Sequence, residues 1–188
     1  MTIRKTHIII ASLAIIAVQA LILYFLGRSL VCPCGYVKIW DGAVKTSQNS
    51  QHLFDWYSFS HLIYGFILYF AGWILRKKFG WPMEIIFLGV LLASVGWEIF
   101  ENTQFVMHRF QHNTISFDYY GDSIINSISD TVCMAFGFWL AFYFPVWAII
   151  TLAIGLELLA GYQIHDNFLL NVIMFIHPLK TILSWQSG

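Results

Sequence analysis

The chain has 188 residues, of which 59% are hydrophobic and only 11% are charged, and its formal net charge is zero. Soluble domains carry about a quarter charged residues, so this composition excludes an ordinary soluble protein and indicates a polytopic membrane protein. The sequence has no basic stripe, which excludes the electrostatic footprint of a nucleic-acid-binding protein. It also has no linker or internal repeat, so we expect one integral-membrane domain over residues 1–188.

The first apolar run covers residues 8–26 and is interrupted by Ser12 and Gln19. At about 1.5 Å per residue it reaches roughly 28 Å, which is enough to cross the hydrocarbon core of a membrane. A cleaved signal peptide is the alternative, since basic residues precede the run and residues 17–20 are the nearest candidate for a cleavage site. The run continues well beyond that site, whereas signal sequences have shorter apolar cores, so we predict an uncleaved helix.

Four further spans are predicted from hydropathy, and a shorter sixth segment follows them: 61–75, 83–104, 123–144, 146–164 and 168–185. The last segment contains His177, Pro178 and Lys180, which favours a re-entrant or kinked segment over a full crossing. We therefore predict an all-α fold, a polytopic membrane bundle of five or six spans.

Basic residues predict the orientation of this bundle. Arg4 and Lys5 precede the first span, and residues 76–78 form a basic cluster between the second and third spans, which places both on the cytoplasmic side. The other side also has basic residues, so the bias is modest: Arg28, Lys38, Lys45 and Arg109. In either orientation, the order of the spans brings several segments to the same side: loop 27–60, the end of span three, loop 105–122, the start of span four and the end of span five.

Polar side chains are concentrated in these segments. They are His52, Asp55, His61, Glu98, Glu101, Asn102, Arg109, Asp118, Asp122, Asn126, Asp130, Asp166 and Asn167. Charged and amide groups in or beside hydrocarbon are costly unless they have partners, so such a cluster indicates a functional site.

Span four begins with Asp122, Asn126 and Asp130, which lie on one helical face because they are four residues apart. A purely structural role is the alternative to a functional one. In it, Asp118 or Asp122 caps the helix and the polar side chains of this face form hydrogen bonds to other helices. Asp130 lies about two turns into the membrane, so there we favour a functional role.

Span three ends with Glu98, Glu101 and Asn102, again on one face. Two carboxylates on adjacent turns repel each other when both are ionised, so either one is protonated or a cation lies between them. Arg109, a metal ion and a histidine of the first loop are the candidate partners. A structural Glu–Arg pair is the alternative to a functional site.

His52, Asp55 and His61 are the candidates for acid–base chemistry, because imidazole titrates near neutral pH and a carboxylate can orient it. Ser60 precedes His61, but adjacency in sequence does not make a nucleophile and base pair. The same reasoning leaves open a site for zinc or another divalent ion among His52, His61, Asp122 and Asp130.

Two further motifs have metal-binding residue types. His108 and His112 have the spacing of a zinc-binding helical face, but they fall where span three should end, and we interpret them as interfacial. Cys32 and Cys34 are separated by one residue. They lie in the loop that the predicted orientation places on the non-cytoplasmic side of the membrane, where disulfides persist. A local disulfide, metal ligation and two free thiols are the alternatives for this pair.

Longer motifs run through most of the chain. They are Cys32-Pro-Cys34-Gly35, Asn49-Ser50-Gln51-His52-x-x-Asp55-Trp56-Tyr57-x-x-Ser60-His61, Trp97-Glu98-x-x-Glu101-Asn102 and Asp118-Tyr119-Tyr120-Gly121-Asp122-Ser123-x-x-Asn126-Ser127-x-Ser129-Asp130. In these motifs the chain resembles a family of small bacterial inner-membrane proteins of unknown function with a periplasmic cysteine motif. A fainter likeness, to the VanZ-like envelope proteins, is carried by Glu101-x-x-Gln104, Arg109 and Asp122-x-x-x-Asn126. The resemblance implies a multi-pass protein of the bacterial inner membrane with its polar site at the periplasmic face.

Three functions remain in competition. The first is an enzyme that hydrolyses or transfers a group of a lipid or lipid-linked envelope substrate, with membrane lipid as its partner and a divalent ion such as zinc as the candidate cofactor. In it, a histidine acts as acid–base, Asp55 orients it, and the other acids bind a cation or the head group. The substrate is bound by Asn102, Arg109, Asn126, Asp166 and Asn167. The others are a non-catalytic lipid binder or transporter, and a structural partner of an envelope complex.

Overall fold

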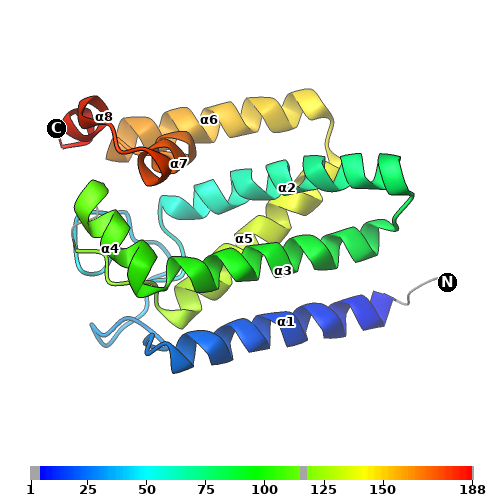
Figure 1. Ribbon diagram of the computed structural model, residues 1–188, viewed down its shortest axis with the longest axis horizontal. Coiled ribbons are helices and arrows are strands. Elements are labelled where there is room, and N and C mark those ends of the chain that lie inside the picture. Colours follow the sequence, from blue (N-terminus) through cyan, green and yellow to red (C-terminus); the bar gives the residue numbers. More distant parts are fainter. Residues whose placement is uncertain (1–4, 115–117, 188) are drawn as a thin grey trace.

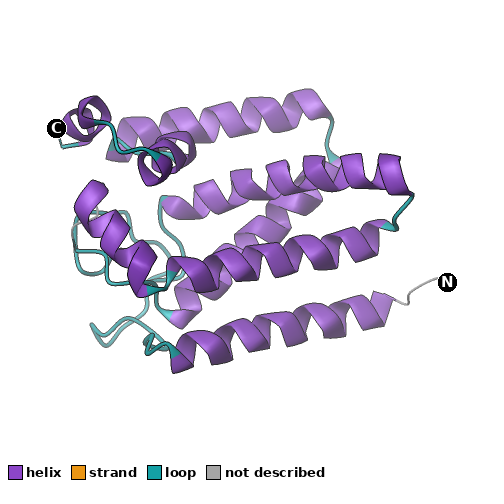
Figure 2. Ribbon diagram, viewed as in Figure 1, coloured by secondary structure: helices purple, strands orange, loops and turns teal. Residues whose placement is uncertain are grey.

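Residues 5–114 and 118–187 are described by the computed structural model, and eight helices lie in this part of the chain (Figure 2). Arg4, one of the residues used above to predict orientation, lies outside it. Five helices are long and apolar enough to cross a membrane: α1 (Lys5–Phe25), α2 (Tyr57–Phe79), α3 (Met83–Glu101), α5 (Ile124–Tyr143) and α6 (Val146–Ile164). The predicted all-α, multi-span architecture is confirmed.

The predicted sixth segment is two short helices, α7 (Phe168–Ile176) and α8 (Lys180–Gln186). They have nine and seven residues, and a helix needs about 20 residues to cross the hydrocarbon core. The break falls at His177, whose backbone is extended because it precedes Pro178. The described chain therefore has five candidate spans rather than six.

Helix α4 (Gln104–Asn113) occupies a segment that the sequence analysis had placed partly in span three and partly in a loop. That prediction was wrong, because α3 ends at Glu101 and the chain turns at Asn102 and Thr103 before α4 begins. Val106, Met107 and Phe110 are buried on one face of α4, a helical pattern that its many polar residues conceal from a hydropathy average.

The segments rich in polar residues gather at one end of the bundle (Figure 1). Helices α4, α7 and α8 and the loop of residues 26–56 lie there, and the first turn of α1 lies at the opposite end. This is the arrangement that the order of the spans predicted.

Helices α2 and α5 form the most extensive helix–helix contact in the bundle. Gly65 and Gly137 make this possible, since a Cβ atom at Gly65 would overlap the carbonyl oxygen of Met134 and one at Gly137 would overlap that of Leu62. Small residues of this kind let two membrane helices approach until their backbones touch. The approach brings the first turns of α2 against the first turns of α5.

The loop of residues 26–56 caps the start of α5. The backbone nitrogen of Ser123 donates to Ser50 O at 3.0 Å, and that of Ile124 donates to Ser29 O at 2.8 Å. These bonds satisfy amide groups that have no partner within a helix. The side chain of Ser123 accepts from the nitrogen of Asn126, so Ser123 caps α5 and the prediction that Asp118 or Asp122 does so was wrong.

Candidate functional site

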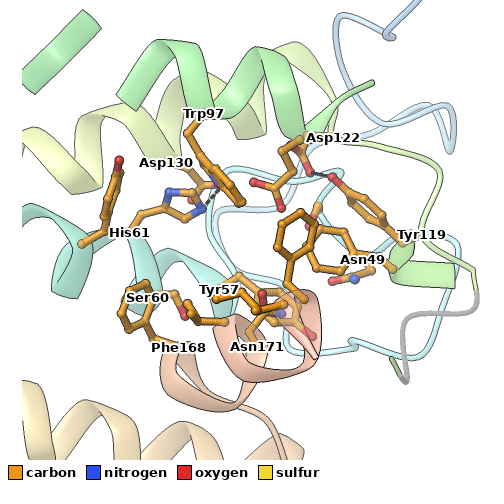
Figure 3. Close-up of a pocket in the computed structure, with 17 residues that line it drawn as sticks. Asn49, Tyr57, Ser60, His61, Trp97, Tyr119, Asp122, Asp130, Phe168 and Asn171 are labelled. Carbon is orange, nitrogen blue, oxygen red and sulfur yellow. Dashed lines mark hydrogen bonds and ion pairs between the residues drawn. The ribbon is translucent and has the colours of Figure 1, made fainter. Parts of the chain in front are cut away.

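A cavity of about 360 Å³ lies at the polar end of the bundle, between α2, α3, α4, α5 and α7 (Figure 3). Apolar side chains form much of its wall: Trp97, Phe110, Phe168, Val172, Phe175 and Ile176. Polar side chains form the rest: Asn49, Ser50, Tyr57, Ser60, His61, Tyr64, Glu101, Tyr119, Asp122, Asp130 and Asn171. Of the predicted site residues, His61, Glu101, Asp122 and Asp130 line this one cavity.

His61 lies between two carboxylates from two other helices. Its Nδ1 is 3.2 Å from Glu98 Oε1, and its Nε2 is 3.9 Å from Asp130 Oδ2, the ion pair marked in Figure 3. Ser58, one turn before His61, donates from Oγ to Asp130 Oδ1 at 3.0 Å. The imidazole therefore lies between two acids, with a ring nitrogen facing each of them.

Glu98 is fully buried, and a chain of hydrogen bonds fixes one of its oxygens. Thr131 Oγ1 donates to Gln19 Oε1 at 3.0 Å, and Gln19 Nε2 donates to Ser127 Oγ at 2.9 Å. Ser127 Oγ then donates to Glu98 Oε2 at 2.7 Å. This leaves Oε1 as the carboxylate atom that faces His61.

Glu101 follows Glu98 on the same face of α3 and lines the cavity. One ligand atom each of His61, Glu98 and Glu101 lie within 4.8 Å of one another, which is close enough for all three to bind the same metal ion. Arg109, one of the three candidate partners of these acids, instead donates to the carbonyl oxygens of Phe175 and Ile176 at the end of α7. No ion pair between it and Glu98 or Glu101 occurs in the described chain.

Asp122 has both carboxylate oxygens occupied by neighbours. Tyr119 Oη donates to Oδ1 at 3.0 Å, and Asn102 Nδ2 donates to Oδ2 at 2.7 Å. The backbone nitrogen of Asp122 in turn donates to Asn102 Oδ1 at 2.8 Å. Burial raises the pKa of Asp122 to about 6, and the hydrogen bonds from Asn102 and Tyr119 act in the opposite direction. Burial, reinforced by the nearby Asp122, raises the pKa of Tyr119 well above its usual value.

His52 lies away from the cavity, in the loop before α2. Its Nδ1 accepts from the backbone nitrogen of Lys38 at 3.2 Å, which leaves the proton on Nε2, and Nε2 lies 3.1 Å from Gln48 Oε1. Burial lowers the pKa of His52, although the nearby Asp41 acts to raise it. Both ring nitrogens are thus used within the loop, and the carbonyl oxygen of His52 accepts from Asn126 Nδ2 at 2.8 Å.

Asp55 caps helix α2. Its Oδ1 accepts from the backbone nitrogens of Tyr57 at 2.8 Å and Ser58 at 3.3 Å, as N-cap residues do. Burial raises its pKa to about 6, and the two backbone hydrogen bonds act in the opposite direction. The hydrogen bonds of the described chain do not join Asp55 to either histidine, so the geometry does not make it an orienting group.

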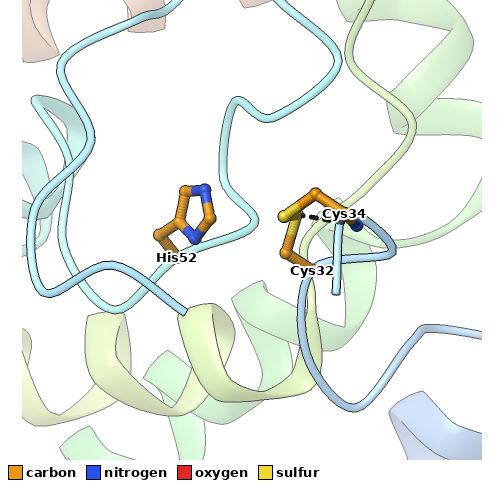
Figure 4. A group of neighbouring side chains, drawn as sticks. All are labelled: Cys32, Cys34 and His52. Atoms are coloured by element: carbon orange, nitrogen blue, oxygen red, sulfur yellow. Dashed lines mark hydrogen bonds between the residues drawn. A yellow bond between two sulfur atoms is a disulfide. The ribbon is translucent and has the colours of Figure 1, made fainter. Parts of the chain in front are cut away.

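Cys32 and Cys34 form a disulfide beside His52 (Figure 4). One donor atom of each lies within 4.8 Å of the others, so this trio also has the spacing of a metal site. In the disulfide neither sulfur is a thiolate, which is the form that binds metals. The rings of His108 and His112 are stacked on the exposed side of α4, with their centroids 3.9 Å apart, and both lie outside the cavity.

The remaining predicted substrate-binding residues hold helix α7 in place. Asn167 Oδ1 accepts from the backbone nitrogen of Leu170 and so caps α7. Asp166 accepts from Tyr57 Oη at 3.2 Å and from Gln186 Nε2 at 2.9 Å, and burial raises its pKa to about 6. These residues do not line the cavity, but they position the side chains of α7 that do.

Sequence reasoning did not identify several residues that support this site. Gln19 and Ser127 orient Glu98, Ser58 holds Asp130, and Tyr119 and Trp97 line the cavity. Gln19 carried a usable signal, since an amide inside an apolar span needs a partner. Trp97, Tyr119 and Ser127 belong to the motifs that carry the family resemblance, but those motifs assign them no role.

The chain was compared with known proteins. Residues 23–188 match a family model described as a protein of unknown function (DUF2585). The chain is 47% identical over 186 residues to a UPF0314 protein of Sinorhizobium fredii (strain NBRC 101917 / NGR234), covering 98% of this chain and 93% of that protein. It is 46% identical over 180 residues to a UPF0314 protein of Rhizobium meliloti (strain 1021), covering 96% of this chain and 90% of that protein.

A more distant relative matches over almost the whole chain. It is a UPF0314 protein of Sphingopyxis alaskensis (strain DSM 13593 / LMG 18877 / RB2256), 43% identical over 187 residues, which cover 99% of this chain and 97% of that protein. No solved structure matches the chain. The resemblance seen in the sequence motifs is confirmed: this polytopic membrane protein belongs to the DUF2585 family, also called UPF0314, of bacterial proteins of unknown function.

Proposed function

We propose that this protein is an enzyme that hydrolyses, or transfers a group from, a membrane lipid or a lipid-linked envelope substrate. One observation carries the proposal: a single cavity combines aromatic and aliphatic walls with His61, Glu101, Asp122 and Asp130. Ligand sites are mostly apolar with a few converging polar groups, which is the composition found here.

The place of the cavity suits an amphipathic substrate. It lies where α2 and α5 begin and α3 ends, at the boundary between the candidate membrane spans and the loops. A lipid there can keep its apolar part against Phe168, Val172 and Phe175 of α7 while its polar group reaches His61 and the acids. Ionisable groups within membrane spans are rare and usually mark functional sites, which favours a site over simple packing.

A hydrolysis at this site would proceed as follows. The oxygen of a water molecule forms a bond to the ester carbon or phosphorus, and the bond to the leaving alcohol oxygen breaks. The proton lost by the water passes to the carboxylate of Asp130, which lies beside His61, and is returned to the leaving oxygen. In a group transfer, an acceptor hydroxyl replaces the water.

A structural role is the second candidate, and the hydrogen bonding of Asp122 favours it. Both oxygens of that carboxylate are occupied by Asn102 and Tyr119, so Asp122 ties α3 to the start of α5. In a purely structural protein, loss of Asp122 or Asp130 would prevent folding and would have no separate effect on activity.

The test uses a strain in which the gene is deleted, together with the purified protein. We expect His61→Ala and Asp130→Asn to fail to restore the lipid composition of the wild-type strain, although both variants still fold. Asp118→Asn is the matched control, since Asp118 is exposed and outside the cavity, and it should restore the composition fully. Full restoration by His61→Ala and Asp130→Asn would refute the enzyme, and unfolding of both in a thermal melt would favour the structural role.

A further inference from the structure

We propose that His61, Glu98 and Glu101 bind one divalent transition-metal ion whose remaining coordination positions face the cavity. This inference rests on the proposed function, because the ion would take part in the reaction proposed there. The three donor atoms lie within 4.8 Å of one another, and they come from α2 and from two successive turns of α3. An imidazole nitrogen with two carboxylates is a donor set that suits zinc and similar divalent ions.

The spacing of His61 Nδ1 and Glu98 Oε1 is that of two ligands of one ion. The atoms lie 3.2 Å apart, yet neither has a hydrogen-bond partner in the described chain, because their mutual geometry is not that of a hydrogen bond. Ligand atoms about 2.0–2.2 Å from a tetrahedral ion lie roughly 3.3–3.6 Å from each other. A small adjustment of the two side chains would therefore accommodate the ion between them.

Glu98 requires a proton or a cation at this position. The hydroxyl of Ser127 accepts from Gln19, so its one proton is directed to Glu98 Oε2. Any proton or cation that neutralises the buried carboxylate must then lie at Oε1, the atom beside His61. A fully buried carboxylate is very costly when it is left without such a partner.

The second nitrogen of His61 supports the same arrangement. Its Nε2 faces Asp130 Oδ2 at 3.9 Å, and Ser58 holds the other oxygen of Asp130. Metal-binding histidines usually direct their second ring nitrogen to a carboxylate or carbonyl, which fixes the tautomer and strengthens the ligand. With the proton on Nε2, the lone pair of Nδ1 is free for the ion.

The charges around the site leave room for a cation. Arg109 is bound to carbonyl groups of α7, and Arg28 donates to the carbonyl of Tyr120. The described ion pairs of Glu98 involve only His61. Two carboxylates and one divalent ion form a neutral group, so the ion would remove the repulsion between Glu98 and Glu101.

The site faces the cavity through Glu101 and His61, both of which line it. Water or the polar group of a substrate could therefore complete the coordination of the ion. An ion in such an open position polarises a bound ester or phosphoryl oxygen and lowers the pKa of a bound water molecule.

The experiment uses the full chain, purified in mild detergent through a tag without histidines and freed of metal with a chelator. Zn²⁺ and Mn²⁺ are added in separate titrations, and bound metal and the melting temperature are measured. We expect one ion per chain and a rise in melting temperature for at least one of the two metals. Wild-type protein that takes up neither ion would overturn the proposal.

Variants assign the site. Glu101→Gln should weaken binding by about 100-fold or more, and Asp130→Asn should weaken it by about 10–100-fold, because Asp130 supports a ligand. Glu84→Gln is the matched control, an exposed acid at the other end of α3, and should bind as the wild type does. Wild-type affinity in both Glu101→Gln and His61→Asn would overturn the assignment even if Glu98→Gln fails to fold.

The two proposals fail separately. Stoichiometric metal in a protein whose His61 and Asp130 variants leave the lipids of the cell unchanged would refute the enzyme and retain the metal site. A metal-free protein that still needs His61 and Asp130 to restore the lipid composition would refute the metal site and retain the enzyme.

Discussion

Gly65→Ala tests whether the contact between α2 and α5 holds the site together. A Cβ atom at position 65 would overlap the carbonyl oxygen of Met134, and it would lie 2.8 Å from the nitrogen of Phe138 and 3.0 Å from the Cα of Gly137. All three neighbours are backbone atoms, so rotation of a side chain cannot relieve the overlap. The two helices must move apart.

The expected cost follows from that geometry. Overpacking of a close contact destabilises proteins by about 1–3 kcal/mol, and rigid backbone neighbours place this variant at the upper end of that range. Gly89→Ala is the matched control, because the space around a Cβ at Gly89 on α3 is open among the described residues, and alanine there gains about 1 kcal/mol of helix propensity. Alanine at position 65, also within a helix, has the same gain, so we expect the two variants to differ in stability by about 3 kcal/mol, the cost of the overlap.

Thermal unfolding in detergent measures this difference. For a chain of this size, 1 kcal/mol corresponds to roughly 2–4 °C, so Gly65→Ala should melt about 6–12 °C below Gly89→Ala. Because α2 carries His61 and α5 carries Asp130, the first variant should also lose function while the control keeps it. Equal melting temperatures and full function in Gly65→Ala would refute the close packing of the two helices.

Three further changes test other parts of the structure. Gly121→Ala should destabilise the protein by about 1–2 kcal/mol, because Gly121 has a φ of 89° and its Cβ would lie 2.8 Å from Asn102 Oδ1; an unchanged melting temperature would contradict this. Asp166→Asn should raise the melting temperature at pH 7 but much less at pH 4. Burial raises the pKa of Asp166 in the folded protein to about 6. The free energy of unfolding therefore falls by about 3 kcal/mol as the pH rises from about 4 to 6. An equal change in melting temperature at both pH values would refute the raised pKa of Asp166. Gln19→Leu should lower the free energy of unfolding by about 1–2 kcal/mol, since it breaks the interhelical hydrogen bonds to Ser127 and Thr131. Gln104→Leu, at an exposed position, is the control, and equal melting temperatures of the two variants would count against those hydrogen bonds.

The sequence alone was enough to predict the class of fold and the end of the molecule where polar residues meet. Long apolar runs specify membrane helices because the backbone must satisfy its hydrogen bonds within the segment. The number and order of the runs then determine which loops share a side. Helix α4 escaped this reasoning, because its burial depends on α7 and on the chain around Tyr119, which contribute Phe175 and Tyr119 to its packing.

The partners of each polar side chain were decided only by the tertiary structure. Periodicity places Asn126 and Asp130 on one face of α5, but the prediction that Asp122 shares that face was wrong, because α5 begins at Ile124. Periodicity also does not show that Asp122 bonds to Asn102 or that Asp130 faces His61. His52 and His61 looked equivalent in sequence, and they separated because the loop uses both ring nitrogens of His52. The close approach of α2 and α5 at Gly65 and Gly137, which sets how the helices cross, is a property of two distant segments that no local pattern encodes.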